Sequence, residues 1–206
     1  SSITIGNTIP SNLVVGVTSS DSFNNDSTLT CSATADDYDV DENVDSLSYT
    51  YTWSTGDTGA TLDLAGSVVP GSTVTCDVTA TDGDDSVSGS DSQGIANRAP
   101  TATASLPSSI TAATSSVTCT GTGSDPDGTT PTLSYGWTVD GSPVSEVSST
   151  LNGPFVYNQV IDCGVTADDG IATGSATASV TVANTAPVVA SVTIDSSAFT
   201  NDTITA

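Results

Sequence analysis

The chain has 206 residues, of which 24 are acidic, one is basic and none is histidine, so its formal net charge is −23. Such a surface repels a phosphate backbone, which excludes nucleic acid as a partner. No apolar run approaches the roughly 20 residues that a membrane-spanning helix needs, so no transmembrane segment is expected in this window.

The composition predicts an all-β protein. Ser and Thr make up about a third of the chain, and they alternate with Val, Ile, Leu and Ala in short runs. Gly, Pro, Asn and Asp separate these runs, which is typical of strands joined by turns. No window has an amphipathic pattern long enough to predict a helix.

A motif of Asn three residues before Pro occurs three times, and its prolines are 90 and then 87 residues apart. The three pairs are Asn7 and Pro10, Asn97 and Pro100, and Asn184 and Pro187. A period of this length indicates tandem domains. We expect residues 1–9 to be the last strand of a preceding repeat, 10–99 the first domain, 100–186 the second domain, and 187–206 the first strands of a following repeat.

The two predicted domains match run by run in chain order. The runs of the first domain are LTCSATADD (29–37), LSYTYTWSTG (47–56) and VTCDVTATDG (74–83). Their counterparts in the second are VTCTGTGSD (117–125), LSYGWTVDG (133–141) and IDCGVTADDG (161–170). Asp140-Gly141 is the kind of dipeptide that closes a hairpin.

Each predicted domain holds two cysteines with a tryptophan between them. The residues are Cys31, Trp53 and Cys76 in the first domain, and Cys119, Trp137 and Cys163 in the second. Four cysteines allow three pairings, and the equivalence of the repeats favours the two bridges within domains. Such bridges form outside the reducing cytosol. A Cys, Trp, Cys order over about ninety residues of short strands predicts tandem immunoglobulin-like sandwiches, with one intradomain disulfide each.

The chain resembles tandem immunoglobulin-like repeats of the PKD/cadherin-like type found in large bacterial surface proteins. The motifs that carry the resemblance are SDPDGTTPTLSYGWTVDG (124–141) and VTATDG (78–83). The chain departs from true immunoglobulin domains because Val74 and Ile161 stand where a tyrosine is expected. The resemblance implies an extracellular or cell-surface protein of bacterial origin that serves as a scaffold or in adhesion, often with calcium.

Carboxylates gather beyond the runs that carry the cysteines. DDYDVDENVD (36–45) has six carboxylates in ten residues. An Asp also lies six residues after each cysteine, on the inward-facing side of an alternating strand. These four are Asp37, Asp82, Asp125 and Asp169. In an immunoglobulin-like sandwich both cysteine strands run toward the same pole, so we expect the acids of each domain to meet there.

These acids predict a calcium site at the pole of each domain, because calcium prefers six to eight oxygen ligands in irregular loops. The expected ligands are Asp36, Asp37, Asp39, Asp41 and Asp82 in the first domain, and Asp125, Asp127 and Asp169 in the second. Sodium and magnesium stay open as alternatives, and so does a role of the acids in turns or solvation alone. The ion would lie beside the Asn-x-x-Pro linker and stiffen the array.

Two functions remain open. The first is a structural repeat of an extracellular stalk, sheath or filament, with neighbouring repeats and further copies of the chain as partners. The second is a calcium-dependent adhesin module that binds a glycan or a protein. An enzyme is not expected, because the chain lacks histidine, lysine and a Gly-rich phosphate loop, and no organic cofactor is implied. Asn25 and Asn201 begin glycosylation sequons.

Overall fold

The computed structural model describes residues 6–38 and 46–192, and all of its regular elements are β-strands. The chain divides into two compact units. The first unit comprises Ser1–Ala102, Thr122–Leu133 and Thr166–Ser175. The second comprises Thr103–Gly121, Ser134–Val165 and Ala176–Ala206. The predicted all-β class is confirmed over the described residues.

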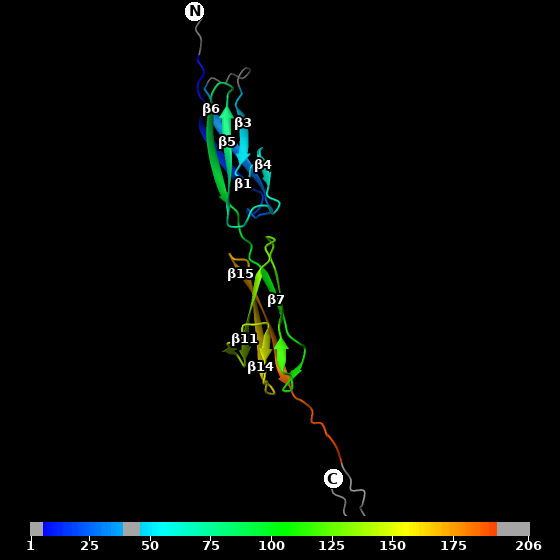
Figure 1. The fold of residues 1–206 in the computed structure, drawn as a ribbon. Helices are drawn as coiled ribbons and strands as arrows, with labels where there is room; N and C mark the ends of the chain where they lie inside the picture. Colours follow the sequence, from blue (N-terminus) through cyan, green and yellow to red (C-terminus); the bar gives the residue numbers. More distant parts are fainter. Residues whose placement is uncertain (1–5, 39–45, 193–206) are drawn as a thin grey trace, which may run out of the picture. The chain divides into compact units, whose positions relative to one another are not determined.

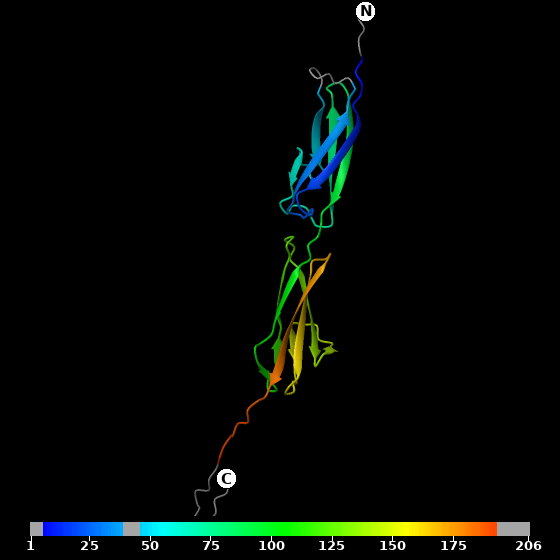
Figure 2. The same cartoon turned by 180° about the vertical axis from the view of Figure 1, so that it is seen from behind.

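Two three-stranded sheets form the first sandwich, in the orders β1-β2-β4 and β3-β5-β6. The strands are β1 (Ser11–Ser19), β2 (Thr28–Asp36), β3 (Ser48–Trp53), β4 (Thr61–Asp63), β5 (Thr73–Thr81) and β6 (Ser86–Gly94). Figure 1 shows β3, β5 and β6 side by side, and Figure 2 shows the blue arrows of β1 and β2 from behind. This is the grouping of strands A, B and E against C, F and G in an immunoglobulin-like sandwich.

Alternation of side chains explains why these runs become strands. Along β5 the buried positions are Val74, Cys76, Val78 and Ala80, and the residues between them are more exposed. The pattern has the period of two that a strand with one buried face requires. Hydrophobic patterning therefore fixes which face of each strand enters the core.

The second sandwich is built from β7 to β15. The strands are β7 (Thr101–Ser105), β8 (Ile110–Thr111), β9 (Ser116–Thr118), β10 (Thr120–Ser124), β11 (Thr132–Val139), β12 (Ser142–Val144), β13 (Thr150–Asn152), β14 (Val160–Asp168) and β15 (Thr173–Ala183). The sheet orders are β12-β11-β14-β15-β8, β13-β9 and β10-β7. Asp140 and Gly141 both have positive φ, 51° and 76°, and join β11 to β12 as a two-residue hairpin turn, as predicted.

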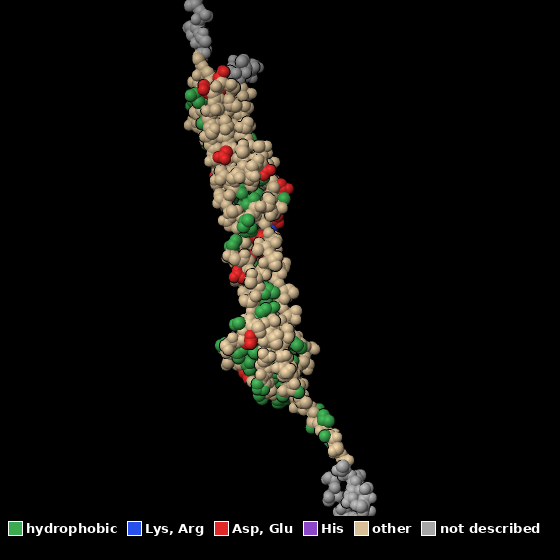
Figure 3. Space-filling model, viewed as in Figure 1, with side chains coloured by type: hydrophobic (Ala, Val, Ile, Leu, Met, Phe, Trp, Pro, Cys, Tyr) green, Lys and Arg blue, Asp and Glu red, His purple; other side chains and the backbone are tan. Residues whose placement is uncertain are grey.

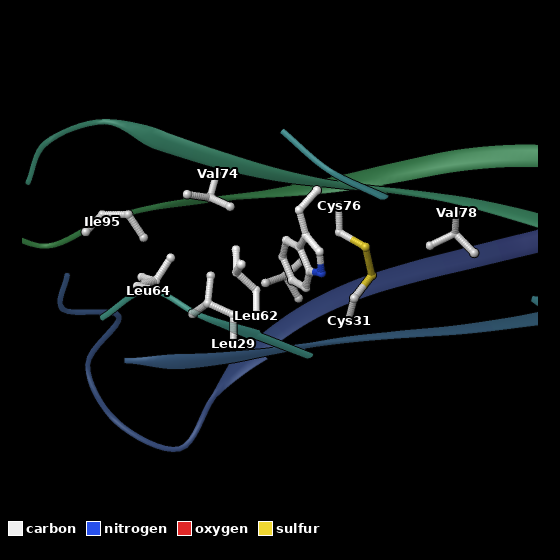
Figure 4. Packing of buried hydrophobic residues seen from close by; sticks show 10 residues of the cluster. Leu29, Cys31, Leu62, Leu64, Val74, Cys76, Val78 and Ile95 are labelled. Carbon is white, nitrogen blue, oxygen red and sulfur yellow. A yellow bond between two sulfur atoms is a disulfide. The ribbon is translucent and has the colours of Figure 1, made fainter. Parts of the chain in front are cut away.

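A disulfide lies in the core of each sandwich, as the sequence predicts. Cys31 on β2 is bonded to Cys76 on β5, and both side chains are at most 2% exposed. Figure 4 shows this bond between Val78 on one side and a group of leucines on the other. Trp53 is paired with Cys76 across β3 and β5 and is 1% exposed, and its indole N–H donates to the carbonyl of Gly59.

The second sandwich repeats this arrangement. Cys119, between β9 and β10, is bonded to Cys163 on β14. Trp137 on β11 is 2% exposed and donates its indole N–H to the carbonyl of Ser148. The fold and its disulfides therefore define a protein of tandem immunoglobulin-like β-sandwiches.

Small uncharged polar side chains cover the outward faces of the strands. On β6 the outward residues are Ser86, Ser88, Ser90 and Ser92. Two hydroxyl pairs join β5 to β6, between Thr75 and Ser92 and between Thr79 and Ser88. Figure 3 shows that uncharged polar side chains and backbone (tan) make up most of the visible surface, and that the acidic side chains (red) occur in small groups.

Candidate functional site: the acidic loops

The four predicted inward-facing acids occupy one structural position. Each is the first residue after the strand that carries or follows a cysteine, and each is half-buried. They are Asp37 after β2, Asp82 after β5, Asp125 after β10 and Asp169 after β14. The alternation counted from the cysteines therefore predicts their position and partial burial.

Asp82 organises the turn after β5 and also holds the linker. Its Oδ1 accepts hydrogen bonds from the backbone N–H groups of Asp84 and Asp85, both at 2.8 Å. Its Oδ2 accepts from Nδ2 of Asn7 at 3.2 Å. These donors, the N–H of Asp85 first, hold the pKa of the Asp82 carboxyl below its usual value.

Asp169 repeats this arrangement in the turn after β14. Its Oδ1 accepts from the backbone N–H groups of Ile171 and Ala172, both at 2.7 Å, and its Oδ2 accepts from Nδ2 of Asn97 at 3.0 Å. The N–H of Ala172, followed by the Asn97 amide, lowers the pKa of the Asp169 carboxyl. We call each hydrogen bond between a linker asparagine and this aspartate a linker clamp.

Asp127 forms an ion pair with Arg98, which is the only basic residue of the chain. The backbone N–H of Arg98 donates to Oδ2 of Asp127 at 2.7 Å, and Nε of the same arginine donates to Oδ1 at 2.7 Å. The Asp127 side chain is fully buried in this contact. The hydrogen bond to Asp127 raises the pKa of the Arg98 guanidinium further above its usual value, and the arginine is therefore charged at neutral pH.

A second loop of the first compact unit completes this group. The terminal Nη2 of Arg98 donates to the Asn25 carbonyl at 3.2 Å and to the backbone carbonyl of Pro126 at 2.9 Å, and it lies 3.2 Å from the Asp26 carboxylate. Asn25 is 3% exposed, and its Nδ2 donates to the backbone carbonyl of Asp127 at 2.8 Å. We call these five residues the Arg98 cluster. Because the arginine stands alone in its linker motif, no periodic signal in the sequence points to this cluster.

The remaining predicted ligands have other surroundings. Asp36 accepts a hydrogen bond from Nδ2 of Asn12 at 3.0 Å. Asp125 accepts from the backbone N–H of Asp127 at 2.7 Å through Oδ1, and its Oδ2 is buried without a hydrogen bond from the described residues. Asp39 and Asp41 lie outside the described residues.

The positions of these acids bear on metal binding. Within residues 6–38 and 46–192, no group of three or more His, Cys, Asp or Glu side chains is placed to hold a metal ion. Asp125, Asp127 and Asp169 of the second domain are accordingly not in such a group, and the cation that contacts Asp127 is the Arg98 guanidinium. Calcium in the second domain stays a prediction of the sequence. Calcium in the first domain stays a prediction, because two of its expected ligands are not described.

The two sequons begin at Asn25 and Asn201. Asn25 is buried within the Arg98 cluster, so a glycan on its Nδ2 would replace the hydrogen bond to Asp127. Asn201 lies outside the described residues. Glycosylation at both positions stays a prediction of the sequence.

The described part of the chain contains no helix long and apolar enough to cross a membrane. Both pairs of cysteines are oxidised, which is typical of proteins that fold in an oxidising compartment such as the extracellular space.

No family model matches the sequence, and no curated protein matches it. Among solved structures, the chain is similar to three N-terminal domains of the Highly Immunogenic Outer Capsid protein (Hoc) of bacteriophage RB49. The two share 19% sequence identity with a TM-score of 0.34, over 84% of this chain and 59% of that chain. The chain thus spans less than two thirds of that structure, and a likeness at this level carries no conclusion about function.

Proposed function

We propose that the chain is a non-enzymatic structural repeat of an extracellular stalk, sheath or filament. The observation that carries this proposal is the recurrence of the linker clamp, from Asn7 to Asp82 and from Asn97 to Asp169. A polar pair at the same position of successive repeats is suited to an architectural role, because each repeat of a tandem array needs the same connection to its neighbour.

The chemistry of the clamp supports this role. The carboxylate binds the turn with one oxygen and the linker amide with the other, so the turn and the linker are held by the same side chain. A proline lies three residues after each asparagine, and its ring fixes the φ angle at that position of the linker. A linker fixed at both points has fewer conformations than a flexible one of the same length.

By the acidic loop of the first domain we mean residues 36–45, which carry six carboxylates. Calcium bound by this segment belongs to the proposal. Asp36 is the last residue of β2 and Asp37 follows it, and Asp39 and Asp41 come next in the sequence. Carboxylates this close repel one another unless a cation reduces their charge. Thr8 stands in the first linker where Arg98 stands in the second, so this linker supplies no side-chain cation of its own. A hard divalent ion with oxygen ligands is the natural replacement.

A calcium-dependent adhesin is the second candidate, and one observation favours it. The ring of Tyr38 is 83% exposed beside an open depression of about 590 Å³. The lining residues are Ala35, Asp36, Asp37, Tyr38, Ser46 and Leu47. Exposed tyrosines are common anchors in protein and glycan recognition.

Calcium binding by calorimetry tests the metal part of the proposal. The oxidised chain should bind calcium, and a variant with Asp37→Asn and Asp82→Asn should lose most of that affinity. Asp57→Asn, which removes an exposed carboxylate from the β3–β4 connection, is the matched control. Unchanged affinity in the double variant would remove the proposed site.

Electron microscopy of the native material separates the two functions. Regular fibres that bind an antibody against this chain would support the structural repeat and its assembly with further copies. Dispersed molecules that bind a glycan or a protein at the depression beside Tyr38 would support the adhesin. The variant Tyr38→Ala should then lose binding of that ligand.

A further inference from the structure

At one position the second linker has a residue that neither of the other two linkers has. The residue two places before the linker proline is Thr8, Arg98 or Thr185. The domain before each linker differs as well, at the residue six places before its first cysteine. This residue is Asn25 in the domain before the Arg98 linker, and Ala113 in the domain before the Thr185 linker. The arginine and its buried asparagine partner are therefore present together and replaced together.

We propose that Arg98 is a built-in cation that fastens the loop at Asp127 to the loop at Asn25, and that this makes a metal ion unnecessary at the second domain's acidic loop. This inference rests on the proposed function, in which the first domain's acidic loop is held by calcium. It assigns Arg98 a positioning role.

The hydrogen bonds of the Arg98 cluster form a closed set. Asn25 donates to the Asp127 carbonyl with its amide nitrogen and accepts from Arg98 with its amide oxygen. Arg98 uses its backbone N–H and its Nε for the two oxygens of the Asp127 carboxylate. Both buried partners, Asn25 and Asp127, are thereby satisfied. The guanidinium donates through Nε to the Asp127 carboxylate and through Nη2 to the oxygens of Asn25 and Pro126. Arginine is better suited than lysine to this contact because its planar group presents several donors in fixed directions.

A metal ion at Asp127 would have to displace this arrangement. Both carboxylate oxygens already accept hydrogen bonds from Arg98, and the guanidinium supplies a full positive charge. Calcium binding would place a divalent cation against that charge, which costs free energy through like-charge repulsion. The cluster therefore predicts that the loop at Asp127 is ordered without calcium.

Amide hydrogen exchange of the oxidised chain tests this inference. Arg98→Thr introduces the residue found in the other two linkers. This variant should speed amide exchange by about tenfold or more in both loops. The probes are the N–H groups of Asp127 and Gly128 in the first loop, and in the second loop the N–H of Gly66, which donates to the backbone carbonyl of Asn25. Ile95, whose N–H donates to Ser72 in the core of the first sandwich, should exchange at an unchanged rate. The variant Asn25→Ala should give the same pattern, and the double variant should exchange no faster than Arg98→Thr alone.

Calcium distinguishes this inference from the proposed function. Added calcium should leave exchange at Asp127 and Gly128 unchanged in the wild-type chain, whatever it does to the first domain's acidic loop. Unchanged exchange in Arg98→Thr, or calcium-dependent protection of Asp127 in the wild type, would overturn the inference. Calcium without effect at Asp37 and Tyr38 would instead count against the proposed function alone. Arg98→Lys keeps the charge and the backbone hydrogen bond to Asp127 but replaces the Nε and Nη2 donors by a single ammonium group, so it should give an intermediate rate.

Discussion

Removal of the Cys31–Cys76 disulfide should destabilise the first sandwich by about 4 kcal/mol. The two cysteines are 45 residues apart in sequence. In the chain-entropy model, a cross-link over a loop of this length removes about 13 cal/mol/K from the unfolded state, which is about 4 kcal/mol at 25 °C. This is a large share of the 5–15 kcal/mol that typically stabilises a folded domain.

Urea unfolding with a single tryptophan measures this effect. Trp53 is buried beside the bond, so a Trp137→Phe background reports the first sandwich alone. With an m value of about 1–2 kcal/mol/M, the double replacement of Cys31 and Cys76 by Ala should lower the midpoint by about 2–4 M.

The second disulfide offers a matched comparison. Its cysteines, Cys119 and Cys163, are 44 residues apart, so their removal should cost the second sandwich nearly the same free energy. Trp137, in a Trp53→Phe background, reports that transition. A midpoint shift under about 0.5 M for either bond would refute the argument that loop closure dominates its contribution.

Close contacts and titration give two further predictions. Gly174→Ala should destabilise the fold by about 1–3 kcal/mol in urea unfolding, because an added Cβ would lie 1.9 Å from the backbone oxygen of Pro100. Gly136→Ala, where an added Cβ meets nothing within 4 Å, is the control and should be close to neutral. Asp169 has a pKa lowered in the folded state, so its stabilising effect is present above the unfolded pKa near 3.8 and is lost as pH falls through the lower folded value. Asp169→Asn should therefore flatten the fall of stability below about pH 4, measured by urea unfolding as a function of pH. A slope equal to that of the wild-type chain would contradict this.

Much of the fold can be predicted from local patterns. The alternation around Cys76 and Cys163 identifies the buried face of two strands, and the repeat equivalence identifies the disulfide partners. The dipeptide Asp140-Gly141 identifies a hairpin turn because few other residue pairs tolerate positive φ twice in succession. These features depend on residues close in sequence or on matched positions.

The candidate site could be predicted only in part, for a physical reason. The count of six residues from each cysteine gives the positions of Asp82 and Asp169, but it does not say what their oxygens bind. Carboxylates accept hydrogen bonds from backbone and amide donors as readily as they bind metal ions. In this chain Asn7 and Asn97 supply such donors from segments more than 70 residues away. The Arg98 cluster likewise joins segments far apart in sequence, and a single arginine has no period that could reveal it.

Thermal unfolding with calcium tests the central claim most directly, because a ligand that binds only the folded state raises its stability. At a calcium concentration about 100 times the dissociation constant, the gain is about 2.7 kcal/mol, or roughly 10–20 °C for a domain of about 90 residues. Trp53 fluorescence should report a higher midpoint with calcium than with chelator, at equal ionic strength, and magnesium should not reproduce the shift. A midpoint at Trp53 that does not respond to calcium would contradict the account and leave the acidic loop of the first domain as a solvated surface.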